Sequence, residues 1–290
     1  MTDKYVLFIT KSGLNDFFSQ VHRTISYCKK HNRILLLDMT SGSYNINFSD
    51  YFHIPIDECN IIYDTDKIKD ILFTHNTLSV YPNHLDLNPI DFMNKNIKFE
   101  FKDKDNKRFR CYKNILLDLP DTVNEDIILH CGYYGGDGFL LFKQLGLTEN
   151  LKSICNQKMK LLQNNYLCIQ VRNTDYKCDY STLYENHKEK IHSYDQIYIC
   201  TDDESVITFF KSKNLNVYCF TTFPKIKTVL HYSSVPGDIK LQDVIVDIFI
   251  ATNSREILSN SKGGFIQLLR NCFMNKECIL DMLNELRKPL

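Results

Sequence analysis

The sequence predicts an α/β fold whose parallel sheets carry helices on both faces. Short apolar runs alternate with helical stretches throughout the second half of the chain, and the first half opens in the same strand–helix–strand order. Apolar residues make up 43% and charged residues 24% of the 290 residues, a composition typical of a globular protein. That length allows two domains, each with its own core.

The first half begins as a βαβ unit. The expected elements are a strand at 5–10, a helix at 17–30, strands at 33–38, 115–117 and 127–129, and a pair of helices over 139–162. Residues 40–107 hold short apolar pieces among many Asn, Asp and Lys residues. We therefore expect loops and surface there rather than a separate module.

The second half alternates strand and helix. Strands are expected at 166–171, 196–200, 217–220 and 256–258, and helices at 185–194, 204–213, 241–253 and 264–274. We place the boundary within 150–164 and predict domains of residues 1–155 and 156–290. Two Rossmann-like domains facing across a cleft form the GT-B architecture, which is the expected fold class.

Charge and cysteine content exclude several protein classes. Lys plus Arg and Asp plus Glu number 35 each, whereas a nucleic-acid-binding protein usually has a basic excess, so no nucleic-acid partner is expected. The eleven cysteines are odd in number and form no Cys-x-x-Cys pair. This favours buried free thiols in a reducing compartment over a disulfide framework or a zinc site.

The sequence contains no membrane or metal signature. No segment approaches the ~20 continuous apolar residues of a transmembrane helix, and the apolar run at 5–9 is too short and wrongly flanked for a signal peptide. We therefore expect a cytoplasmic protein. Histidines do not cluster at ligand spacing, and Asp103-Lys104-Asp105 lies in a lysine-rich stretch typical of a solvated loop.

Arg172 follows the apolar strand at 166–171, where the chain turns polar. Open α/β sheets bind their ligands at the carboxyl ends of their strands, and a guanidinium is always charged and binds phosphate through paired hydrogen bonds. Arg172 is therefore a candidate phosphate ligand that Asp175 would orient. The alternative is a surface ion pair between the two residues, which would contribute little to stability.

Asp247 lies in a stretch, 241–251, that is apolar nearly all round. Its carboxylate is expected to be poorly solvated and to require a partner. The N1–H and the amino group of guanine donate together to a carboxylate, so Asp247 is a candidate ligand of a guanine base. The alternative is pairing with a lysine or arginine of the same or a neighbouring helix.

Two loops are candidate anion sites because small residues precede a helix. Residues 259–265 and 12–16 both follow a predicted strand, and the backbone amides and dipole of a helix start attract anions. Each loop taken alone is better explained as an ordinary capped turn. Asp202 ends another strand and is a candidate ligand of a ribose hydroxyl, whereas Asp203 is as readily the N-cap of the next helix.

Taken in order, these segments resemble the fucosyltransferase superfamily, which includes α1,2-, α1,6- and protein O-fucosyltransferases. Three segments resemble the α1,6 enzymes: residues 171–175 (VRNTD) resemble their His-x-Arg-Arg-Thr-Asp segment, residues 197–203 (IYICTDD) resemble the strand and acidic pair that follow it, and residues 246–248 (VDI) resemble their guanine-binding segment. Two segments resemble the α1,2 enzymes: residues 258–265 (LSNSKGGF) resemble their Asn-Ser-x-Phe-Ser loop, and residues 12–16 (SGLND) resemble their opening Gly-Gly-Leu-Gly-Asn-Gln. The resemblance covers residues 5–38 and about 165–272.

The resemblance implies an inverting, metal-independent transferase that moves fucose from GDP-fucose, its donor substrate, to an oligosaccharide or other glycoconjugate, without a cofactor. Residues 1–155 would form the acceptor side and 156–290 the donor-binding side. The implied catalytic residues are Arg172, Asp175 and Asp179. The implied donor-binding residues are Gly13, Asn15, Asp16, Gln170, Arg172, Asp202, Asp247, Ser261, Lys262, Gly263 and Gly264.

The chain departs from the family pattern at several positions. Gln170 replaces the leading histidine, Asn173 replaces the second arginine, and a Gly-Gly pair replaces the Phe-Ser part of the diphosphate loop. The glutamate that is the proposed base of the α1,6 enzymes falls near Tyr180, where Asp179 and Glu185 are the neighbouring carboxylates.

Other functions stay as alternatives at this stage. One is the same fold with another nucleotide sugar, and another is a non-catalytic module that binds a nucleotide sugar or a glycan. A dinucleotide-dependent oxidoreductase is disfavoured because no Gly-x-Gly-x-x-Gly fingerprint follows the first strand.

Overall fold

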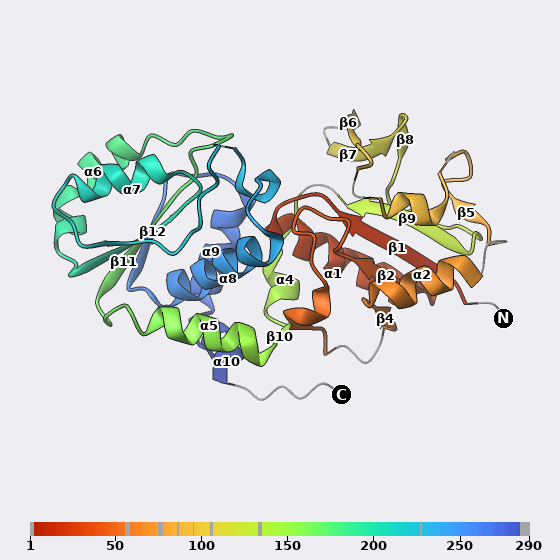
Figure 1. The fold of residues 1–290 in the computed structure, drawn as a ribbon, viewed down its shortest axis with the longest axis horizontal. Helices are drawn as coiled ribbons and strands as arrows, with labels where there is room; N and C mark the ends of the chain where they lie inside the picture. The colour runs from red at the N-terminus through yellow and green to blue at the C-terminus, as the bar shows by residue number, and fades with distance from the viewer. Residues whose placement is uncertain are drawn as a thin grey trace. The chain divides into compact units, whose positions relative to one another are not determined.

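A computed structural model describes residues 3–55, 59–74, 78–85, 87–94, 96–104, 107–132, 135–226 and 228–284, except the side chains of 103–104, 107–109 and 231. The chain divides into two compact units. Unit 1 ends at Gly146 and unit 2 begins at Leu147. Each unit is built on its own parallel sheet (Figure 1).

Unit 1 contains a five-stranded parallel sheet with the strand order β4-β2-β1-β9-β5. Its strands are β1 (Tyr5–Thr10), β2 (Ile34–Asp38), β4 (Ile61–Ile62), β5 (Val80–Tyr81) and β9 (Ile127–Gly132). Its helices are α1 (Leu14–His31), η1 (Phe48–Asp50), α2 (Thr65–Thr74), α3 (Pro89–Phe92) and α4 (Phe139–Phe142). Strands β1 and β9 are buried along their whole length, as expected for parallel strands covered on both faces.

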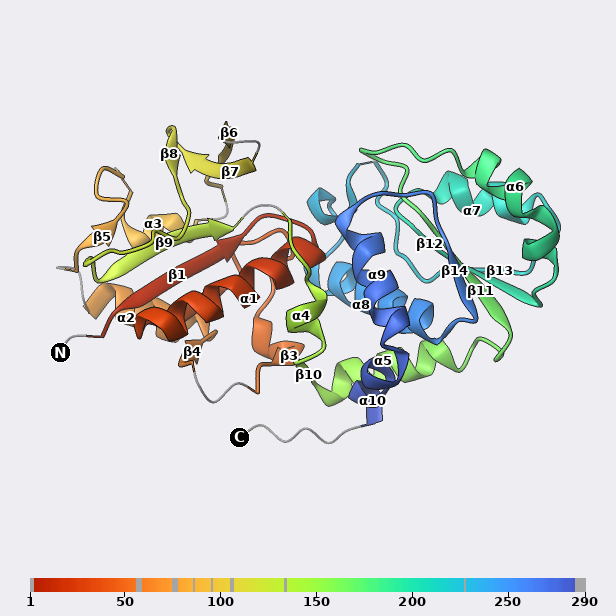
Figure 2. The same cartoon turned by 180° about the vertical axis from the view of Figure 1, so that it is seen from behind.

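Helix α1 lies along one face of this sheet (Figure 2), and α2 and α3 pack on the other. On the α1 face, the rings of Phe8 and Phe17 lie 6.4 Å apart between centroids. On the opposite face, Leu7 belongs to a buried cluster with Ile68 of α2 and Phe92 of α3. Because side chains alternate along a strand, β1 supplies residues to both cores.

The region 40–107 contains more regular structure than the sequence predicts. Strands β6 (Glu100–Lys104), β7 (Lys107–Tyr112) and β8 (Ile115–Leu116) form a separate antiparallel sheet. The prediction of loops is also wrong for α2, which buries Ile68 and Leu72 four residues apart. Together with the partly buried Ile71, these residues form one apolar face that packs on the sheet. The remaining short strands are β3 (Phe52–His53) and β10 (Gly146–Leu147).

Unit 2 contains a four-stranded parallel sheet with the order β13-β12-β11-β14. Its strands are β11 (Tyr166–Val171), β12 (Gln196–Thr201), β13 (Val217–Tyr218) and β14 (Glu256–Leu258). Its helices are α5 (Glu149–Met159), α6 (Tyr180–His192), α7 (Glu204–Lys211), η2 (Leu230–Tyr232), α8 (Gly237–Asn253), α9 (Gly264–Met274) and α10 (Lys276–Asn284). The predicted alternation of strand and helix is confirmed.

The two faces of the unit 2 sheet differ in polarity. Helices α6 and α7 cover one face, where Leu183 and Val206 pack in an apolar cluster with Ile169 of β11. Helix α8 covers the other face, and there the tyrosine hydroxyls of β11 and β12 reach the helix. The Tyr166 hydroxyl donates to the carbonyl oxygen of Ile250 at 2.7 Å. The α8 face therefore contains polar groups that need partners.

Candidate functional site

Arg172 follows β11 directly, at the carboxyl edge of the unit 2 sheet. Its Nε donates to Asp175 Oδ1 at 2.7 Å and its Nη2 donates to Asp175 Oδ2 at 2.5 Å. The two side chains are 30% and 40% exposed. The structure thus brings Arg172 and Asp175 together in a two-pronged ion pair, which fixes the plane of the guanidinium while leaving it accessible to a ligand.

The turn after Arg172 is held by the acidic pair at the end of β12. Asp202 accepts hydrogen bonds from the backbone N–H of Asn173 at 2.7 Å and from the Thr174 hydroxyl at 2.5 Å. Asp203 accepts from the Asn173 side-chain amide at 2.6 Å and also caps α7. Asp202 therefore supports the Arg172 turn, with each of its oxygens accepting one hydrogen bond from that turn.

The loop after β14 is hydrogen-bonded to the same turn. The Ser261 hydroxyl accepts from the backbone N–H of Arg172 at 3.3 Å and lies 3.0 Å from the Cys178 thiol. Ser259 accepts from the Ser261 N–H at 3.0 Å and donates to the side-chain oxygen of Gln170 at 2.7 Å. Ser259 and Ser261 belong to the loop that sequence analysis singled out, whereas Cys178 was missed because it lies in no distinctive pattern.

Gly263 and Gly264 place the start of α9 against the guanidinium. Gly263 is the N-cap of this helix, and a Cβ added to it would lie 3.0 Å from Arg172 Nη1. Lys262 is exposed in the same loop. A fixed guanidinium, a neighbouring lysine and the amides of a helix start all favour negative charge, so this corner of unit 2 is a candidate anion site.

Asp247 is buried where α8 faces β12, with 5% of its surface exposed. The Tyr198 hydroxyl donates to its Oδ1 at 2.6 Å, so a tyrosine, rather than a lysine or arginine, contacts the carboxylate. Burial raises the pKa of Asp247 to about 8, and the carboxylate of Asp243, one turn earlier on α8, also raises it. A carboxylate in such a place gains most from a ligand that donates hydrogen bonds.

Asp179 is the N-cap of α6. It accepts hydrogen bonds from the Ser181 hydroxyl at 2.8 Å and from the backbone N–H and the hydroxyl of Thr182 at 2.9 and 2.7 Å. These bonds lower the pKa of Asp179 to about 2. The geometry is that of a capping carboxylate, and a group with so low a pKa is a poor proton acceptor near neutral pH.

The predicted site residues of unit 1 lie at the start of α1. Gly13 is its N-cap, and Asp16 follows within the first turn. The Asn15 side chain donates to the Gly136 carbonyl at 3.2 Å and accepts from the Gly138 N–H at 3.1 Å. Residues 136–138, which follow β9 in the chain, are therefore hydrogen-bonded to the first turn of α1.

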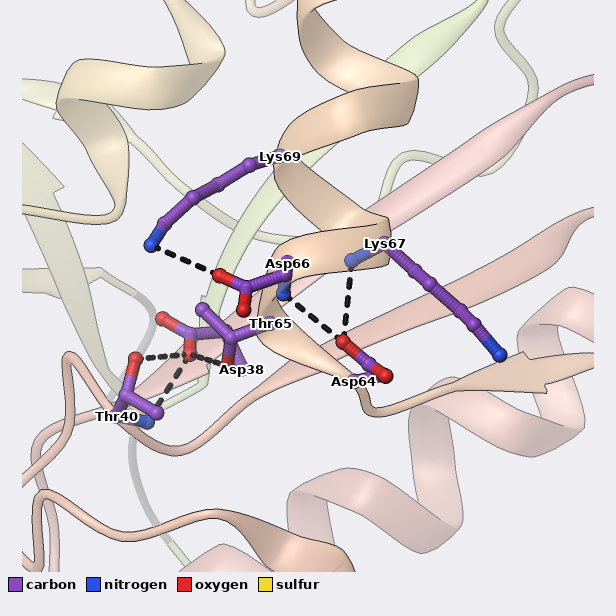
Figure 3. A network of polar contacts seen from close by, with 7 residues as sticks. All are labelled: Asp38, Thr40, Asp64, Thr65, Asp66, Lys67 and Lys69. Atoms are coloured by element: carbon purple, nitrogen blue, oxygen red, sulfur yellow. Dashed lines mark hydrogen bonds and ion pairs between the residues drawn. The ribbon is translucent and has the colours of Figure 1, made fainter.

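Asp38 lies at the same edge and was missed by sequence analysis. It is the buried last residue of β2 and accepts from the backbone N–H and hydroxyl of Thr40 and from the Thr65 hydroxyl, at 3.0, 2.7 and 3.4 Å (Figure 3). Asp64 caps the start of α2 in the same view. Asp38, like Arg172, lies at the carboxyl end of a strand, and this pattern could have identified it. The hydrogen bonds from Thr40 show that the Asp38 carboxylate fixes the turn after β2.

The described residues contain no cluster of His, Cys, Asp or Glu side chains suited to a metal ion. Asp105 and the side chains of Asp103 and Lys104, which form the Asp-x-Asp motif, lie outside the part of the chain that the structure describes. None of the described helices combines the length and the apolar character that a membrane span requires.

Comparison with known proteins gives a match in structure but not in sequence. No protein-family model matches the chain, and no curated protein sequence matches it either. The structure of NodZ α-1,6-fucosyltransferase co-crystallized with GDP matches with a TM-score of 0.61 and 15% identity, over 93% of this chain and 92% of that chain. The fucosyltransferase NodZ from Bradyrhizobium matches with a TM-score of 0.60 and 16% identity, over 93% of each chain.

POFUT1 in complex with GDP-fucose also matches, with a TM-score of 0.53 and 10% identity over 93% of this chain and 95% of that chain. At such low identity the likeness shows the fold. The chain has a fucosyltransferase-like α/β fold with parallel sheets, as in the GT-B structures, and this part of the sequence prediction is confirmed.

Proposed function

We propose that this chain is an inverting, metal-independent glycosyltransferase that moves fucose from GDP-fucose to a hydroxyl group of a glycan. The observation that carries the proposal is the Arg172 guanidinium, fixed by Asp175 and lying against the glycine start of α9. The fold supports it, because solved structures of this fold were determined with GDP and with GDP-fucose.

The diphosphate would occupy the corner formed by Arg172 and the loop that contains Lys262 and Gly263. When the bond between the sugar and the β-phosphate breaks, negative charge grows on the departing phosphate oxygen. A guanidinium and backbone amides already in position stabilise that charge without reorganisation, which is usually the largest contribution to such catalysis. Asp175 acts through Arg172, and Asp202 acts by holding the turn.

Asp247 would bind the guanine base. Its carboxylate accepts from Tyr198 on one oxygen and would accept from guanine N1–H and the amino group. A base without these two donors forms neither hydrogen bond with Asp247, and the loss of both bonds discriminates against the wrong base. Gln170, buried beside Ser259, would lie between the phosphate and base positions.

The transfer would proceed in a single displacement. The acceptor oxygen forms a bond to the anomeric carbon as the carbon–phosphate-oxygen bond breaks, which inverts the configuration. We assign the acceptor proton to the departing phosphate rather than to Asp179, because both oxygens of Asp179 already accept hydrogen bonds at the start of α6. Unit 2 would bind the donor, and unit 1, which contains Gly13, Asn15 and Asp16, would bind the acceptor.

Calorimetric titration with GDP, GDP-fucose, UDP and ADP in EDTA tests the donor assignment. We expect GDP to bind without metal and in preference to UDP and ADP. Arg172→Ala should weaken binding about ten- to a hundredfold, since it removes charged hydrogen bonds to phosphate. Arg255→Ala is the matched control, because this exposed arginine donates to the Asn164 carbonyl at the opposite end of the sheet. Preference for UDP, or equal effects of the two variants, would contradict the proposal.

A further inference from the structure

Unit 1 contains a cavity of about 520 Å³ that lies apart from the carboxyl edge of its sheet. Two segments line it: residues 81–84, which follow β5, and residues 122–125, which precede β9. Because residues 122–125 lead into β9, they lie at the amino end of that strand. The volume is in the range of small-ligand sites, roughly 300–1,000 Å³.

The segment before β9 is held in place by a buried cation. Arg33 is 5% exposed, and its Nη2 donates to the carbonyl oxygens of Val123 and Glu125 at 3.0 and 2.9 Å. Lys4 donates to the Asn124 carbonyl at 2.8 Å. The backbone of this wall is therefore ordered before any ligand arrives, which lowers the entropic cost of binding.

The opposite wall is tied to the same segment. Strand β5 pairs with β9, and Ser79, next to β5, donates to the Asp126 carboxylate from its N–H and its hydroxyl at 2.9 and 2.8 Å. The backbone amide of Glu125 and the side chain of Asn83 hydrogen-bond the Glu125 carboxylate and lower its pKa. Asn83 and Glu125 thus join the two walls across the cavity.

The lining groups suit a polyhydroxylated ligand. Asn83, Thr122, Asn124 and Glu125 present amide, hydroxyl and carboxylate groups, which exchange hydrogen bonds with sugar hydroxyls. Tyr81 supplies an aromatic ring, whose flat apolar face packs against the C–H face of a pyranose.

The charged groups near the cavity favour a neutral carbohydrate over an anionic one. Burial and, after it, the carboxylates of Asp118 and Glu125 raise the pKa of Tyr81. Asp118 is paired with Arg23 at 2.8 Å, so Glu125 is the lining carboxylate that would repel an anionic sugar. The nearby cations, Lys4 and Arg33, are already directed at backbone carbonyls. We propose that this cavity is a binding site for a neutral oligosaccharide, separate from the donor site of unit 2.

Saturation-transfer NMR without nucleotide tests this proposal independently of fucosyl transfer. The probes are lactose, N-acetyllactosamine, maltotriose and sialyllactose. We expect transfer to at least one neutral probe and markedly less to sialyllactose than to lactose. Asn83→Ala and Glu125→Gln should each weaken the neutral interaction about fivefold or more.

Glu189→Gln and Asn216→Ala, at exposed positions in unit 2, are matched controls and should leave the signal unchanged, as should Arg172→Ala. Melting temperatures confirm that each variant is folded. Absence of transfer to all three neutral probes overturns the proposal, and so does transfer that Asn83→Ala and Glu125→Gln leave unchanged. Loss of donor binding in Arg172→Ala bears only on the proposed transferase function.

Discussion

The buried Asp247 carboxyl should couple GDP binding to the release of a proton. With a pKa of about 8, about nine in ten Asp247 side chains are protonated at pH 7. Guanine N1–H and its amino group donate hydrogen bonds and therefore bind the ionised carboxylate. The groups of the described residues that act on the Asp247 carboxyl are the Tyr198 hydroxyl and Cys200 thiol of β12, the Thr221 hydroxyl and the Asp243 carboxylate of α8. None of them supplies a positive charge to offset deprotonation.

The expected magnitude follows from the pKa. Affinity for GDP should rise about tenfold per pH unit below pH 7 and level off above about pH 8, with about 0.9 proton released per GDP at pH 7. Calorimetry in buffers of different ionisation enthalpy measures that number directly. Asp247→Asn should weaken binding and abolish its share of proton release, whereas Asp238→Asn, at an exposed position in the first turn of α8, should do neither.

GDP itself can also gain or lose protons when it binds. The difference in proton release between the wild type and Asp247→Asn removes that contribution. Asp247 does not bind guanine as a carboxylate if GDP binds both proteins with the same number of protons released, or if the affinity of the wild type follows the same pH profile as that of Asp247→Asn. A wild type that fails to bind GDP at any pH would instead contradict the proposed donor.

Three further predictions concern single side chains. Gly263→Ala would place a Cβ 3.0 Å from Arg172 Nη1. We therefore expect the affinity for GDP to fall up to about tenfold, while the melting temperature stays unchanged. If calorimetry shows an unchanged affinity, Arg172 does not bind the diphosphate as proposed. Asp179→Asn should keep the helix cap and most of kcat, whereas Asp179→Ala should lower the melting temperature; a loss of about a hundredfold in kcat for Asp179→Asn alone would identify Asp179 as the base. Because its folded-state pKa is raised, Asp247 reduces stability as pH rises from about 4 to about 8. Asp247→Asn should therefore gain in melting temperature relative to wild type between pH 5 and pH 8.5, and a constant difference would show that Asp247 titrates normally.

The central strands could be predicted from sequence because burial on both faces leaves an unbroken apolar run. Strands β1 and β11 begin and end at the predicted residues for that reason. Helix α6 begins at Tyr180, earlier than expected, because Asp179 caps it through side-chain contacts that periodicity does not reveal. Strand β7 was missed because it contains buried Arg110, whose guanidinium lies 4.2 Å from the ring of Phe101 and donates to the Lys11 carbonyl.

The sequence predicted residues of the candidate site only where a single residue stands out from the pattern around it. Arg172 and Asp247 stood out as a cation at a strand end and a carboxylate in an apolar helix. The support of Arg172 by Asp202 was not predictable, because it depends on β11 and β12 being neighbours in the sheet. Likewise, the role of Arg33 in ordering the wall at 122–125 depends on a contact between residues far apart in the sequence.

The most direct test of the central claim is turnover of GDP-fucose by the purified protein in EDTA. GDP formation and fucosylated product are measured together on a panel of oligosaccharide acceptors, with Arg172→Ala and Arg255→Ala in parallel. We expect equal amounts of GDP and fucosylated glycan from the wild type and Arg255→Ala, and little product from Arg172→Ala. GDP-fucose that binds but is not consumed with any acceptor, or that is consumed only when a divalent metal is added, would contradict metal-independent fucosyl transfer by this chain.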